Sequence, residues 1–192
     1  MTVATVLESL IRDYDLITHG KSGGSVRERG ERLYFCFAEP RSADEKGLYE
    51  HHTDNGACKI TIYRPGVSPS GSIHHAVALA AASPSAEVEL PYLVHELGHH
   101  LSNLSGTFVP LSQRDPEASY AEEVRAWAIG ERLLVRKGWR SSWYCFKKLE
   151  RCSLEGYRCG LNLDFEEGSE IEQGVRGQVE QWTFPRTAGD AG

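Results

Sequence analysis

The sequence predicts an α+β fold, in which a small sheet precedes two long amphipathic helices. Residues 32–38 and 57–63 are rich in β-branched or aromatic side chains, and the second run alternates around Ile60 and Ile62. Apolar side chains then recur at helical spacing over 91–105 and 116–137. These patterns indicate the elements, but they do not show which strands are neighbours in the sheet.

The helix predicted over 91–105 has one apolar face. Pro91 is expected in its first turn, and Gly106 is expected to end it. On a helical wheel the apolar face is formed by Leu93, Val94, Leu97, Leu101 and Leu104. The opposite side carries two histidines and a glutamate.

His95 and His99 lie one helical turn apart, so both imidazoles can face a single metal ion. Glu96 follows His95 at about 100° around the helix axis, within reach of a water held by that ion. This His-Glu-x-x-His spacing is typical of zinc hydrolases in which the glutamate is the general base. A coincidental match on a helix surface is the alternative. His100 points elsewhere, as a flanking residue.

The second helix begins with Asp115 as N-cap and Pro116 at its first position, and Gly138 is expected to end it. Its wheel places Arg125, Arg132 and Arg136 on the solvated face and Tyr120, Val124, Trp127 and Leu134 on the buried one. Glu123 falls in the buried arc, whereas Glu122 lies nearer the polar side. Ala126 and Gly130 would let this helix approach the first closely.

A catalytic zinc ion usually has three protein ligands, so the two histidines need a third donor. Glu123 is the preferred one, because metal coordination is one of the few ways to compensate a buried carboxylate. An ion pair between Glu123 and an arginine, or coordination by Glu122, are alternatives. A metzincin is disfavoured, since Ser102 and Ser105 occupy the positions where that class has Gly and His or Asp.

The motif HELGHHL followed by EEVRAWAIGERLL resembles the gluzincin zinc peptidases, specifically the small ImmA/IrrE-like peptidases of bacteria and phages. The resemblance covers about residues 55–137 and implies a zincin fold, with a small sheet packed on the HExxH helix. It implies one Zn²⁺ per chain, held by His95, His99 and Glu123, with Glu96 as general base. Trp127 stands where the family more often has Asn.

Composition restricts the partners. The chain has 192 residues, with 21 basic and 27 acidic side chains and a net charge of −6, which disfavours nucleic acid. It has no signal-peptide pattern and no apolar run long enough to span a membrane, so we expect a cytoplasmic protein. The five cysteines form no paired motif, and free buried thiols are expected; a second metal or redox site at Cys145, Cys152 and Cys159 is the alternative.

We expect one domain over 1–160. It would begin with a helix over 2–18 and include a polar loop between the strands, a short helix at 73–82 and an aromatic, cysteine-containing segment at 139–160 that packs on the core. Residues 161–192 are acidic and are expected to be mobile, with an inhibitory position near the active site as a further hypothesis.

The sequence therefore predicts a zinc-dependent endopeptidase that hydrolyses a peptide bond in a protein substrate by metal-activated water, with Glu96 as general base. Tyr120, His74, His75 and Arg125 are candidate oxyanion partners. The alternative is a zinc-binding regulatory or interaction module with little turnover. A regulatory protein partner is compatible with either function, and an effector peptidase acting on one host protein would share the mechanism.

Overall fold

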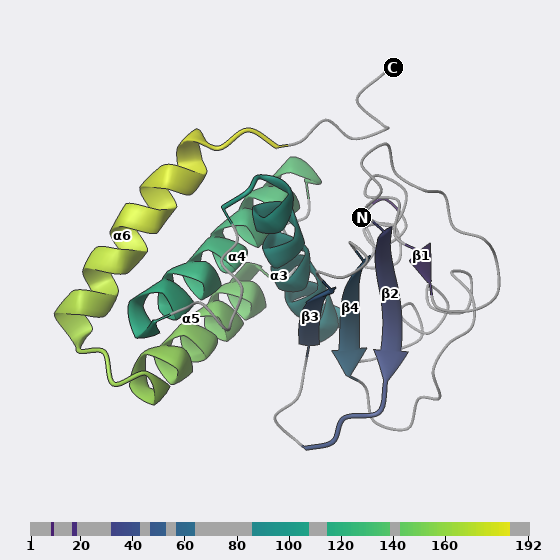
Figure 1. Cartoon of the computed structure of the whole chain (residues 1–192), viewed down its shortest axis with the longest axis horizontal. Helices are drawn as coiled ribbons and strands as arrows, with labels where there is room; N and C mark the ends of the chain where they lie inside the picture. The colour runs from purple at the N-terminus through teal and green to yellow at the C-terminus, as the bar shows by residue number, and fades with distance from the viewer. Residues whose placement is uncertain are drawn as a thin grey trace. The chain divides into compact units, whose positions relative to one another are not determined.

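The computed structural model describes residues 9, 17–18, 32–42, 47–52, 57–63, 86–107, 115–138 and 143–184. Within these ranges the fold is α+β, as predicted, with a mixed four-stranded sheet and four long helices (Figure 1). The chain divides into two compact units. One contains the sheet and helix α3 up to Glu96, and the other runs from Leu97 to Pro185.

The sheet has the strand order β1-β2-β4-β3. Strands β2 (Arg32–Ala38) and β4 (Ala57–Tyr63) are parallel and match the two predicted runs. Cys58, Ile60 and Ile62 are buried, as expected for a strand with neighbours on both sides. Strand β4 is therefore central, and β3 is the edge strand on that side.

The helix predicted over 2–18 is wrong at its C-terminal end. Ser9 is helical, but Ile17–Thr18 form strand β1, which pairs in parallel with Tyr34 and Phe35 of β2. Pairing with an existing strand satisfies backbone groups that a helix would otherwise satisfy internally, and a single-segment pattern contains no information on it. The short helix predicted at 73–82 lies outside the described residues.

Strand β3 (Gly47–His52) lies within the segment that the sequence analysis assigned to a polar loop. It pairs antiparallel with β4, with Tyr49 opposite Ile60, and the Tyr49 hydroxyl donates a hydrogen bond to Cys58 Sγ at 3.1 Å. The sequence pattern did not indicate this strand, because the polar residues Glu50, His51 and His52 interrupt the alternation expected of a half-buried strand. Strand β3 is stabilised by its antiparallel pairing with β4, which the sequence of the segment alone does not show.

Helix α3 (Ala86–Leu104) begins five residues before the predicted start. Pro91 is inside the helix and is not in its first turn, which corrects that prediction. Four of the five predicted apolar residues, Leu93, Val94, Leu97 and Leu101, are buried, and Leu104 is half-buried. The helix ends at Leu104, and Gly106 follows it with a φ of 74°, in the left-handed region that favours glycine.

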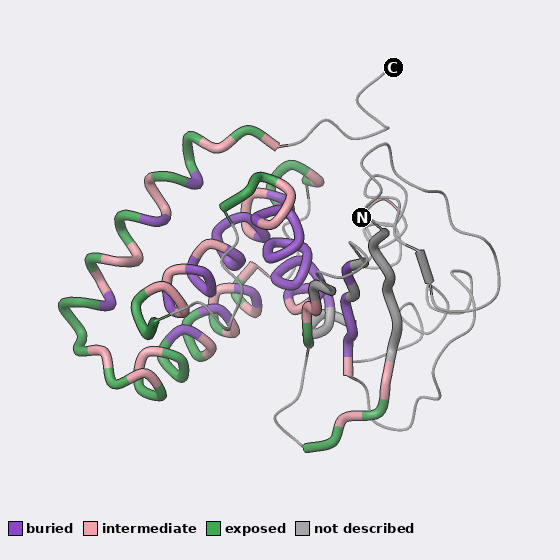
Figure 2. Tube along the Cα trace, viewed as in Figure 1, coloured by how far each residue is buried: buried purple, intermediate pink, exposed green. Residues whose placement is uncertain are grey.

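Helix α4 (Pro116–Arg136) has the predicted bounds to within one residue. The Asp115 side chain accepts a hydrogen bond from the amide of Ala118 at 2.7 Å, and Gly138 follows the helix with a φ of 68°. The helix is buried over most of its length (Figure 2), and its predicted buried side chains, Tyr120, Val124, Trp127 and Leu134, are all at most 1% exposed.

Helices α3 and α4 approach each other closely at Gly98. A Cβ atom at this position would overlap the backbone carbonyl of Ala126, so only glycine fits. Small residues at a crossing point allow two helix backbones to approach closely. The predicted close approach is confirmed at Ala126, with Gly98 as its partner on α3, whereas the role of Gly130 stays a prediction.

Helix α5 (Trp143–Gly160) packs on α4, as predicted for the aromatic segment. Phe146 is fully buried and contacts Trp127 edge to face, with ring centroids 5.3 Å apart. The helix continues through Gly156, so Cys145, Cys152 and Cys159 lie on one helix. Cys152 and Cys159 are exposed, which corrects the expectation of buried thiols; Cys58 is buried.

Helix α6 (Phe165–Gln181) occupies the segment expected to be a mobile acidic tail. Asp164 and Glu167 form a capping box, so two of the acidic residues stabilise the helix start. Val175 and Val179 are buried, and α6 packs along α4 (Figure 1). The acidic composition reflects a capped amphipathic helix.

Ionic contacts link the last three helices. Glu150 of α5 is 4% exposed and is paired with Lys147 at 2.9 Å and with Arg176 of α6 at 2.5 Å. Lys147 also pairs with Glu131 of α4 at 2.6 Å. Arg132 of α4 donates to the Val179 and Trp182 carbonyls at the end of α6.

Among the described helices, none is long and apolar enough to cross a membrane.

The Gly98 contact predicts a measurable loss of stability. In a Gly98→Ala variant the new methyl group would push α3 away from α4, and we expect a loss of about 1–3 kcal/mol in the free energy of unfolding. Gly156→Ala is the matched control, because a Cβ atom there meets nothing within 4 Å. It should stabilise α5 by about 0.5–1 kcal/mol. Equal stability of the two variants in urea denaturation would contradict the close approach.

Candidate metal centre

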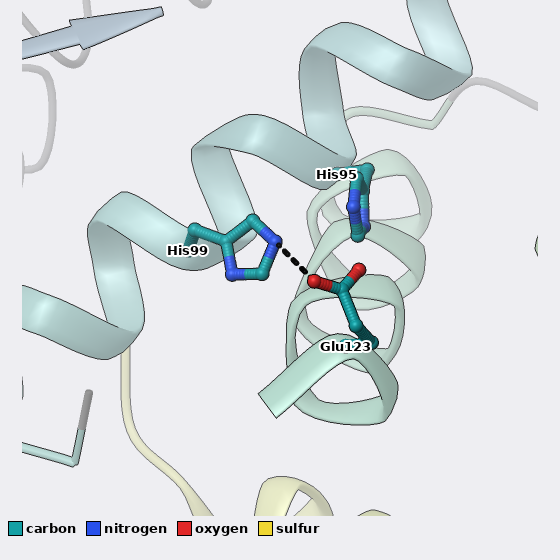
Figure 3. Close-up of side chains that lie close together, drawn as sticks. All are labelled: His95, His99 and Glu123. Atoms are coloured by element: carbon teal, nitrogen blue, oxygen red, sulfur yellow. Dashed lines mark ion pairs between the residues drawn. The ribbon is translucent and has the colours of Figure 1, made fainter. Parts of the chain in front are cut away.

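The three predicted metal ligands lie together on two helices. His95 and His99 are on α3 and Glu123 is on α4 (Figure 3). One nitrogen of each histidine and one carboxylate oxygen of Glu123 all lie within 4.8 Å of one another. The three residues are 6–7% exposed. This buried group could hold a metal ion.

His99 contacts a different glutamate through each ring nitrogen. Its Nε2 atom is 3.5 Å from Glu123 Oε1, the contact drawn in Figure 3. Its Nδ1 atom is 3.2 Å from Glu122 Oε1. The two adjacent glutamates of α4 therefore face opposite edges of one imidazole. Only the Glu123 side belongs to the group formed with His95.

Glu122 is fully buried, whereas the sequence analysis placed it nearer the polar side of α4. Arg125 explains the difference, because its Nη1 donates to Glu122 Oε2 at 2.7 Å. The hydroxyl of Ser102 on α3 donates to the same oxygen at 3.2 Å. A helical wheel of α4 alone cannot show that Arg125 and a residue of a second helix, Ser102, compensate the charge of Glu122.

The charge on His99 depends on these carboxylates. Burial lowers the pKa of the imidazole, but the negative charges and hydrogen bonds of Glu123 and Glu122 outweigh burial and raise its pKa to about 10. In the metal-free protein the imidazole is therefore protonated at neutral pH. A divalent cation would replace that proton, since a histidine binds a metal ion only in its neutral form.

The donor set fits zinc. Two imidazoles and one carboxylate are the ligands of one common type of catalytic zinc site, which keeps a fourth position for water or substrate. No thiolate belongs to the group, so its chemistry does not favour Cu(I) or an iron–sulfur cluster. Magnesium and calcium prefer oxygen ligands alone, which the two histidines do not supply.

Gly47 of β3 is a residue that the sequence analysis did not identify. A Cβ atom at this position would lie 2.6 Å from Oε1 of Glu96, the predicted general base. Glycine thus leaves space for the carboxylate against the edge strand. The only signal in the sequence was an isolated glycine before Leu48, which became informative once residues 47–52 were known to form a strand.

The candidate oxyanion residues are only partly tested. The Tyr120 hydroxyl donates to Glu172 of α6 at 2.6 Å, and burial and this carboxylate raise the pKa of Tyr120. Arg125 is paired with Glu122. Both side chains therefore have structural partners, and His74 and His75 lie outside the described residues. The oxyanion role of each stays a prediction.

Comparison of the chain with protein-family models, with curated proteins and with solved structures gives no match. The resemblance to ImmA/IrrE-like peptidases therefore depends on the two sequence motifs alone. The roles of His95, Glu96, His99 and Glu123 stay predictions that metal binding can test directly.

We expect the purified parent protein to bind about one zinc ion per chain. Glu123→Ala should abolish this binding, because it removes the only carboxylate of the group. Glu117→Ala is the control, since Glu117 is an exposed glutamate in the first turn of the same helix. Mass spectrometry of the metal content measures both. Retention of a full complement of zinc by Glu123→Ala would exclude Glu123 as a ligand.

Proposed function

We propose that this protein is a zinc-dependent endopeptidase of the gluzincin type, with a zincin-like arrangement of its sheet and of helices α3 and α4. The observation that carries the proposal is the buried group of His95, His99 and Glu123, because α4 supplies a carboxylate to an HExxH helix. A coincidental HExxH match would have no reason to place a buried glutamate beside its histidines.

In this proposal the three ligands hold the ion, and Glu96 acts on the water that attacks the peptide bond. The ion would supply Lewis-acid chemistry, lowering the pKa of that water and polarising the scissile carbonyl. Glu96 follows His95 on α3 and is 6% exposed, so its carboxylate is shielded from bulk solvent. It would accept the proton of the water and deliver it to the leaving nitrogen.

The position of strand β3 favours a peptide as the substrate. It is the edge strand beside β4, and Gly47 at its start lies against Glu96. An extended peptide can add to such an edge through main-chain hydrogen bonds, which tolerate varied side chains. Strand β4 is paired with β2 and β3 on its two sides, so within the described sheet β3 offers the edge next to Gly47.

Glu96→Gln should abolish peptide hydrolysis and keep the zinc, because the amide cannot accept the proton but retains the shape of the side chain. His99→Ala is the contrasting variant and should lose the metal. Cleavage of a denatured protein or a peptide library, with zinc content measured in parallel, tests both. If Glu96→Gln cleaves as fast as the parent, the mechanism is wrong. A parent that binds zinc and cleaves nothing would favour a binding module.

Gly47→Ala should reduce turnover without loss of zinc. The added Cβ atom would meet Glu96 Oε1 at 2.6 Å and displace the carboxylate, while the metal ligands on α3 and α4 are unchanged. We expect a decrease in kcat of at least about tenfold, since a displacement of about 1 Å near reacting groups can cost 100-fold. Gly174→Ala, where a Cβ atom meets nothing within 4 Å, is the control.

A further inference from the structure

We propose that Glu122 is a positioning residue that fixes the ring orientation and the tautomer of His99 for metal binding. The inference rests on the proposed function, because it concerns the same site. It assigns distinct roles to the two adjacent glutamates, with Glu123 as a ligand and Glu122 as the acceptor behind a ligand. The sequence alone left coordination by Glu122 open.

The geometry separates these roles. Glu122 Oε1 lies 3.2 Å from Nδ1 of His99, while the Nε2 atom faces Glu123 at 3.5 Å. An imidazole that donates its Nδ1 proton to a carboxylate has its Nε2 lone pair free for a metal ion. Glu122 therefore selects the tautomer whose basic nitrogen points to Glu123.

Both oxygens of Glu122 have defined partners. Oε1 faces His99, whereas Oε2 accepts hydrogen bonds from Arg125 at 2.7 Å and Ser102 at 3.2 Å. With contacts on three sides and a 0% exposed side chain, the carboxylate has little freedom to rotate. The fixed Glu122 carboxylate can therefore fix the orientation of the His99 imidazole.

Electrostatics reinforces the orientation. The guanidinium of Arg125 lies 2.7 Å from Glu122 Oε2 and compensates the charge of this buried carboxylate. A carboxylate behind a histidine ligand also increases the basicity of the imidazole and strengthens its bond to the metal ion. Loss of such a partner typically weakens metal binding by about 10–100-fold.

The test measures zinc affinity by chelator competition on the full chain. Glu122→Gln should weaken binding by about 10–100-fold and still bind one ion, because the amide oxygen accepts from Nδ1 but carries no charge. The matched control is Glu150→Gln, which alters another buried, ion-paired glutamate whose partners Lys147 and Arg176 lie on α5 and α6. Its zinc affinity should equal that of the parent.

Visible spectra of the cobalt-substituted proteins provide a readout that a general loss of stability would not change. We expect a shifted ligand-field band for Glu122→Gln and an unaltered band for Glu150→Gln. If the parent binds one ion and Glu122→Gln matches it in affinity and spectrum, the positioning role is wrong and the proposed function stands. If the parent binds no metal ion, the proposed function and this inference are both wrong.

A second measurement is made on the parent protein, and a variant is used only to assign its signals. Nitrogen NMR of the zinc-loaded parent distinguishes a protonated from a metal-bound ring nitrogen, and His99→Gln identifies the signals of His99. We expect a proton on Nδ1 and the metal ion on Nε2. Coordination through Nδ1 would overturn the inference, since Nδ1 is the atom that faces Glu122.

Discussion

Gly98 of α3 lies directly against the backbone carbonyl of Ala126 on α4, and the candidate metal centre depends on this contact. Gly98 is next to His99, and Ala126 is one turn from Glu123, so this close approach lies beside two of the three predicted ligands. A larger residue at Gly98 would separate the helices before their polar side chains could meet. The glycine therefore serves packing and chemistry at once.

The same approach buries several ionisable side chains in one place, which is costly unless each charge has a partner. His99 faces Glu123 and Glu122, and Arg125 and Ser102 satisfy the far oxygen of Glu122. In the metal-free protein the protonated His99 balances these carboxylates, which is why its pKa is raised although burial opposes it. A bound divalent cation would take over that balance and release the proton.

The sequence predicted those features that local patterns determine. Strands β2 and β4, the caps of α4 and the inward position of Glu123 follow from periodicity and from end signals that a single segment contains. Strand β3, the burial of Glu122 and the proximity of Gly47 to Glu96 depend on a partner elsewhere in the chain. Helix α6 was missed because its acidic residues suggested disorder, although Asp164 and Glu167 form its capping box. A helical wheel of one segment shows no contacts with partners elsewhere in the chain, whereas the capping box of α6 was a local signal that its acidic composition outweighed.

Trp127 shows how the helices beyond the two motifs contribute to the site. The family that the motifs resemble more often has Asn at this position, whereas here Trp127 packs edge to face on Phe146 of α5. One face of α4 thus carries the glutamates toward α3, and another packs on α5 and α6, where Lys147 and Arg132 add polar contacts. Burial of Trp127, Phe146, Val175 and Val179 contributes favourable free energy on this second side of α4, beside its ionic contacts. Trp127 therefore links the helix that carries the predicted ligand Glu123 to α5.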